Sequence, residues 1–103
     1  MKKHEIVFLP SAREDFIRLY DYIADRSGPA IAGGYIDRIE AACDQLATFP
    51  ERGTKRDDIR KGLRTLGFER RVTIVFQVTD VEVVIARIFY GGQDYERSLH
   101  GLE

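Results

Sequence analysis

The stretch RRVTIVFQVTDVEVVIARIFY, residues 70–90, has the pattern of two strands joined by a tight turn. Its first part, 70–78, places apolar side chains at alternating positions, as a strand with one buried face does. Its second part, 81–90, is rich in branched and aromatic residues, which favour strands. Both faces of this second strand are apolar, so we expect it to lie inside a sheet with cover on both sides.

Upstream of this hairpin the sequence predicts a strand and two helices. The segment EIVFL, 5–9, is a short strand candidate. Ser11 and Glu14 have the spacing of a capping box, which predicts that a helix starts at Ser11 as its N-cap. Ser-Gly-Pro at 27–29 ends this helix and starts a second one, whose apolar face runs from Ala32 to Leu46.

The segment between the helices and the hairpin is polar at first and then apolar. FPERG, 49–53, stops the second helix, 52–62 is interpreted as a loop, and 63–68 as a strand. The predicted order is β-α-α-β-β-β. It indicates an α+β fold with an N-terminal strand, a helical hairpin on one face of the sheet, and a three-stranded antiparallel meander completing that sheet. We expect one domain that spans 1–103.

Length and composition restrict the class of protein. The chain has 103 residues, of which 44% are hydrophobic and 32% charged, as in soluble globular domains. No apolar run approaches the roughly 20 residues of a membrane span, and a single cysteine, Cys43, fits a reducing compartment, so we expect a cytoplasmic protein. His4, His100 and Cys43 show no metal-ligand spacing, so neither a metal nor a cofactor is predicted.

Positive charge is concentrated in one part of the chain. The segment 52–71 carries eight basic side chains against three acidic ones, although the net charge of the whole chain is −1. One interpretation is a solvated loop and strand face. The other is a docking surface for an anionic partner, either nucleic acid or an acidic protein segment.

Arg87 and the glycines that follow the last strand are the other conspicuous features. Arg87 interrupts the apolar face formed by Val81, Val83, Ile85 and Phe89. Because an unpaired buried guanidinium is costly, Arg87 should either pair with Glu69, Asp94 or a helix carboxylate, or open onto a groove. The pair at 91–92 can bend the strand, turn the chain or cradle a phosphate, and we favour a sharp exit of the chain.

Taken together, these segments resemble the RelE/ParE superfamily of bacterial toxins, and its ParE branch in particular. The resemblance rests on LPSAREDFIRLYDYIAD, AGGYIDRIEAACDQLATFPERG, GLR and RRVTIVFQVTDVEVVIARIFYGGQD, in this order across nearly the whole chain. It implies the stable toxin of a type II toxin–antitoxin module, with a role such as growth inhibition or plasmid stabilisation. It also implies a ParD-like antitoxin partner, and contact with DNA only through the complex with that antitoxin.

The two branches of the superfamily imply different targets. ParE-like members inhibit DNA gyrase and are not known as nucleases, whereas RelE-like members are ribosome-dependent endoribonucleases that cleave messenger RNA. A nuclease of this type would use the residues Arg64, Arg71, Arg87 and Tyr90. The acidic segment after the glycines and the absence of a basic excess favour the gyrase inhibitor. The residues predicted to contact the antitoxin or the target are Arg56, Arg60, Arg64, Arg70, Arg71, Arg87, Tyr90, Gln93 and Asp94.

Overall fold

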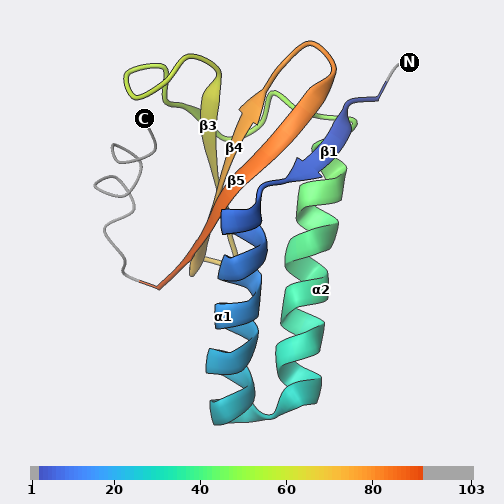
Figure 1. Cartoon of the computed structure of the whole chain (residues 1–103), viewed down its shortest axis with the longest axis vertical. Helices are drawn as coiled ribbons and strands as arrows, with labels where there is room; N and C mark the ends of the chain where they lie inside the picture. Colours follow the sequence, from blue (N-terminus) through green and yellow to red (C-terminus); the bar gives the residue numbers. More distant parts are fainter. Residues whose placement is uncertain (1–2, 92–103) are drawn as a thin grey trace.

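The computed structural model describes residues 3–91 and contains two helices and five strands within that range. In chain order these are β1 (Glu5–Phe8), α1 (Pro10–Ser27), α2 (Pro29–Gln45), β2 (Thr54–Lys55), β3 (Leu63–Phe68), β4 (Val72–Val78) and β5 (Glu82–Tyr90). The two helices run side by side in opposite directions, and α1 packs along β5 (Figure 1). The predicted α+β fold with a helical hairpin is therefore confirmed. No helix in the described range is long and apolar enough to span a membrane.

All five strands form one sheet, in the order β1-β5-β4-β3-β2. The predicted meander of β3, β4 and β5 is antiparallel, and β1 joins it in parallel beside β5. The prediction of a loop throughout 52–62 is wrong at Thr54 and Lys55, which pair with Thr65 and Arg64 as β2. A two-residue strand is too short to show an alternating pattern, so the sequence carries no sign of it.

The predicted capping box is also wrong. Helix α1 begins at Pro10 after Leu9, with no side-chain cap, and the hydroxyl of Ser11 instead donates a hydrogen bond to the carbonyl oxygen of Ala86, 2.8 Å away. Proline fits the first helical turn because its missing N–H would have no partner there. The junction between the helices is as predicted: Gly28, with φ of 93°, is followed by Pro29 at the start of α2.

A main core joins the helices to one face of the sheet, and a smaller cluster lies on the other face. The buried members of the main core are Ala12, Leu19, Ile39, Cys43, Leu46, Val72, Ile74, Phe76, Val83, Ile85 and Ile88. The smaller cluster contains Ile59, Leu63, Val75, Ala86 and Phe89. β5 contributes to both, which confirms the expected cover on both of its faces.

An irregularity in the pairing of β4 with β5 changes which side chains face the helices. Phe76 pairs with Ile85 and Val75 pairs with Arg87, so Ala86 is an extra residue in β5. A bulge of this kind reverses the alternation beyond it. The expected apolar face therefore continues from Ile85 to Ile88, and the prediction that Phe89 shares that face is wrong.

Beyond Ile85, β1 no longer pairs with β5, and side chains of α1 bond the edge of the strand instead. The carboxylate of Asp15 accepts the backbone N–H of Ile88 at 2.9 Å. It also accepts two bonds from the guanidinium of Arg87, from Nε at 2.7 Å and from a terminal nitrogen at 3.1 Å. Of the alternatives for Arg87, pairing with a helix carboxylate is the one that the structure shows. The side-chain hydrogen bonding with Asp15 raises the pKa of Arg87.

We expect Asp15→Asn to lower the free energy of unfolding by about 3 kcal/mol, because it leaves the Arg87 charge without its counter-ion in a partly buried site. Urea denaturation followed by circular dichroism measures this. Asp21→Asn is the matched control, since Asp21 is exposed on the same helix and should change stability by less than about 0.5 kcal/mol. Equal losses for the two variants would show that Asp15 has no special role.

Candidate functional site

The bulge in β5 and the sheet register place two of the predicted site arginines on opposite faces of the sheet. Arg64 pairs with Phe76 of the main core, and Arg87 pairs with Val75 of the smaller cluster. Directly paired residues share a face, so the two guanidinium groups do not meet. Arg64 is buried and donates to the carbonyl oxygen of Arg52 at 3.3 Å, while Arg87 bonds Asp15.

Of the four residues predicted for a nuclease, Arg71 and Tyr90 line a common hollow at the end of the sheet, near Gly91. We define the tyrosine–arginine corner as Tyr22, Tyr35, Tyr90, Arg26, Arg38 and Arg71, which line one hollow of about 320 Å³. Three of these residues, Tyr22, Arg71 and Tyr90, also line a second hollow of about 440 Å³. The corner therefore gathers side chains from both helices, the β3–β4 turn and β5.

The three tyrosine rings of this corner lie close to one another. The ring of Tyr90 lies 5.6 Å from that of Tyr22 and 6.3 Å from that of Tyr35, between centroids. The guanidinium of Arg26 stacks on Tyr22 at 3.8 Å from the ring centroid, and that of Arg38 lies 5.2 Å from the centroid of Tyr35. The predicted half-buried packing role of Tyr90 is therefore confirmed.

The two carboxylates that line these hollows already have partners. Asp15 is bonded to Arg87 and Ile88, and Glu69 forms two bonds with Arg38, at 3.0 and 3.3 Å. Burial, and then the nearby Tyr90 and Glu69, raise the pKa of Tyr35, so its hydroxyl stays protonated near neutral pH. A corner with cationic side chains and phenol hydroxyl groups is suited to binding an anion.

The basic loop that precedes β3 is held by its own side chains. Arg56 forms a bidentate pair with Asp58, at 3.1 and 3.0 Å, and Asp57 accepts the backbone N–H of Gly62 at 2.9 Å. Ile59 is buried beneath the loop. The exposed side chains Arg60 and, on the β3–β4 turn, Arg70 remain at the surface. The predicted contacts Gln93 and Asp94 lie outside the described residues.

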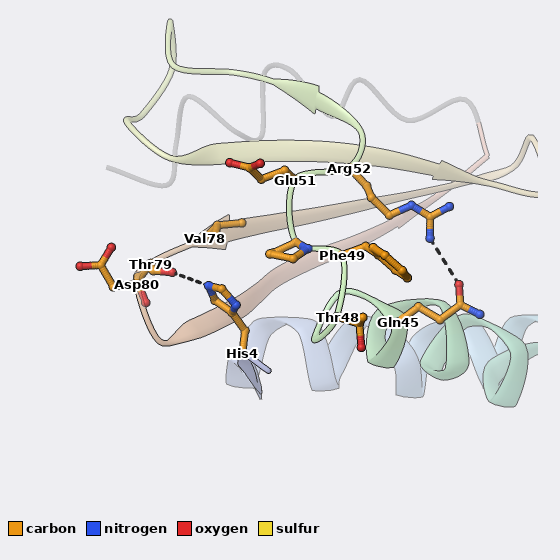
Figure 2. A pocket seen from close by; sticks show the side chains of 10 residues that line it. His4, Gln45, Thr48, Phe49, Glu51, Arg52, Val78, Thr79 and Asp80 are labelled. Carbon is orange, nitrogen blue, oxygen red and sulfur yellow. Dashed lines mark hydrogen bonds between the residues drawn. The ribbon is translucent and has the colours of Figure 1, made fainter. Parts of the chain in front are cut away.

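A third hollow, of about 1120 Å³, lies between the α2–β2 connection and the β4–β5 turn (Figure 2). His4 Nε2 is 2.9 Å from the carbonyl oxygen of Thr79, and Arg52 donates to the side-chain amide oxygen of Gln45 at 3.3 Å. Phe49 is 61% exposed within it. The sequence predicted Phe49 only as part of the segment that ends the second helix. A large aromatic residue in a polar loop is the sequence feature that indicates such an exposed surface.

Cys43 and the potential metal ligands are the remaining reactive groups of the described residues. Cys43 is fully buried in the main core, as predicted, and burial raises the pKa of its thiol to about 12. Within residues 3–91 no group of three or more His, Cys, Asp or Glu side chains is placed to hold a metal ion. The described surface thus offers hollows and exposed cations, which are features of binding.

Comparison with known proteins places the chain in a family. The model described as the ParE toxin of the type II toxin-antitoxin system parDE matches residues 6–95. The chain belongs to the ParE toxin family. It is 31% identical to toxin ParE3 of Caulobacter vibrioides over 77 residues, which is 75% of this chain and 76% of that protein. It is 29% identical to toxin ParE1 of Mycobacterium tuberculosis, over 87% of this chain and 92% of that protein.

Solved structures agree with the fold of this ParE-family chain. A chain of the chromosomal ParDE toxin–antitoxin system from P. aeruginosa superposes with a TM-score of 0.75 and 26% identity, covering 86% of this chain and 97% of that one. A chain of the toxin–antitoxin complex RelBE2 from Mycobacterium tuberculosis superposes with a TM-score of 0.60 and 21% identity, covering 90% of this chain and 97% of that chain. The second likeness concerns the fold alone.

We expect the thiol of Cys43 to be unreactive in the folded ParE-family toxin. With a pKa of about 12, on the order of one thiol in 10⁴ is ionised at pH 8, and only the thiolate attacks disulfide reagents. Labelling by Ellman's reagent at pH 8 should be at least about 100-fold slower in buffer than in 6 M guanidinium chloride. Because the chain has one cysteine, the signal has a single source. Equal rates would contradict a buried thiol.

Proposed function

We propose that this ParE-family toxin acts in the cytoplasm as a gyrase inhibitor that a ParD-like antitoxin neutralises. The family membership and the two related toxins support a role as the toxin of a type II module. The structural neighbour from P. aeruginosa, a ParDE system, supports an antitoxin of the ParD type. In this proposal the toxin acts by binding and breaks no covalent bond itself.

The placement of the arginines is the observation that favours binding over RNA cleavage. Cleaving RNA requires a base, an acid and cations arranged around one phosphate. Arg87 is held by Asp15, and Arg64 is buried on the other face of the sheet with its guanidinium on the carbonyl of Arg52. These two cations therefore have structural partners and do not converge with Arg71 and Tyr90 on a single phosphate. A RelE-like ribosome-dependent endoribonuclease is the alternative that the experiment below distinguishes.

The antitoxin of this proposal covers the toxin through apolar and acidic contacts. Exposed apolar residues lie on both helices, among them Ile17 at 62% and Ile31 at 61% exposed, which an amphipathic segment would cover. Acidic residues of the same partner would face the excess of basic side chains in 52–71. Binding through that charge should weaken as the salt concentration rises.

Purified toxin should inhibit the supercoiling of relaxed plasmid by DNA gyrase or trap its cleaved complex with DNA. The assay is gel electrophoresis of plasmid topoisomers with increasing toxin, and we expect loss of the supercoiled product. An equimolar amount of the cognate antitoxin, added before gyrase, is the control and should restore supercoiling.

A parallel assay tests the alternative with the same toxin preparation. Translating ribosomes are incubated with the toxin, and the messenger RNA is examined for cuts at fixed codon positions. Normal supercoiling in the presence of excess toxin that still arrests growth would exclude the gyrase proposal. Codon-positioned cuts in that same preparation would then assign the toxin to the nuclease branch.

A further inference from the structure

The turn between β3 and β4 adopts a backbone conformation that its residues disfavour. Glu69 and Arg70 have φ of 47° and 66°, the left-handed region in which turns of this kind usually place Asn and Gly. Residues with a Cβ atom are destabilised in this region by steric clash with the backbone. Such conformations persist where the surrounding structure imposes them. Here the two bonds from Arg38 to the carboxylate of Glu69 tie the turn to α2.

The strained turn places Arg71 at the tyrosine–arginine corner. Arg71 directly follows the turn, is exposed, and lines both hollows of the corner. Its guanidinium has no hydrogen-bond or ion-pair partner among residues 3–91, whereas Arg87 and Arg38 are bonded to Asp15 and Glu69. Arg71 is thus an exposed cation beside the corner's hollows whose counter-charge the described part of the chain does not supply.

The hollows on either side of Arg71 have the chemistry of sites for peptide side chains. One is lined by Ile23 and Ile31, the other by Leu19 and Ile88, beside the tyrosine rings. Their volumes, about 320 and 440 Å³, suit one or two side chains each. One face of the Tyr22 ring already carries the guanidinium of Arg26, which leaves less room for a stacked nucleobase.

We propose that the tyrosine–arginine corner binds an acidic segment of the antitoxin, in which a carboxylate pairs with Arg71 and a neighbouring apolar side chain enters a hollow. The inference rests on the proposed toxin–antitoxin function and names the site and the chemistry of the partner. Charge complementarity selects an acidic occupant, because both carboxylates lining the hollows are already bonded within the chain. The apolar walls select a peptide over a free anion.

The test measures, by titration calorimetry at low and high salt, the affinity of the 103-residue toxin for the ParD-like antitoxin that the proposed function assigns to it. Arg71→Ala should weaken binding by about 10- to 100-fold and flatten its salt dependence, because a charge-assisted bond is lost. Arg71→Lys keeps the charge but not the planar guanidinium, so its affinity should lie between those of the wild type and Arg71→Ala. Lys3→Ala removes the same charge outside the corner and should bind like the wild type.

The outcomes separate this inference from the function on which it rests. Equal affinity of Arg71→Ala and wild type, with unchanged thermal unfolding, would overturn the corner as a binding site and leave the antitoxin partnership intact. Absence of binding by the wild type would instead contradict the proposed function. A single-stranded 20-nucleotide DNA is a third probe, and DNA binding that is lost in Arg71→Ala while antitoxin binding is kept would overturn the acidic-peptide assignment.

Discussion

The edge of β5 that faces β1 and α1 needs hydrogen-bond partners along its length in this ParE-family structure. β1 supplies hydrogen-bond partners only for the first part of β5, and unpaired backbone groups beside a packed helix are costly. Helix α1 supplies two partners for the next part of β5: the hydroxyl of Ser11 donates to the carbonyl oxygen of Ala86, and the carboxylate of Asp15 accepts the N–H of Ile88. Since these two residues are one helical turn apart, the bonds fix both the position and the rotation of α1 on the sheet.

The same carboxylate decides what Arg87 can do. Asp15 engages the guanidinium of Arg87, which also lies 4.6 Å from the centroid of the Phe89 ring. Arg87 thereby becomes part of the helix–sheet junction, while Arg71 stays at the surface of a corner that the strained β3–β4 turn holds in place. This separation of structural and exposed cations is consistent with a toxin that binds macromolecules through preformed surfaces.

Sequence patterns predicted the features that depend on local periodicity and on glycine or proline. The meander, the helical hairpin and its junction at Gly28 and Pro29 are of this kind. The features that sequence missed depend on contacts between distant segments. Ser11 has the spacing of a capping residue but bonds β5, and the bulge at Ala86 exchanges the faces of Ile88 and Phe89. For the same reason, sequence left several possible partners for Arg87, and only the packing of α1 against β5 selects Asp15.

Native-state hydrogen exchange at the Ile88 amide reports whether α1 protects the edge of β5. This N–H lies on the part of β5 that β1 does not cover, so its protection depends on the carboxylate of Asp15. If α1 locks this edge, the Ile88 amide should exchange only when the protein unfolds globally, as slowly as the amides in the middle of β4. Exchange at the rate of a frayed edge strand, while β4 remains protected, would show that Asp15 does not hold α1 on this edge.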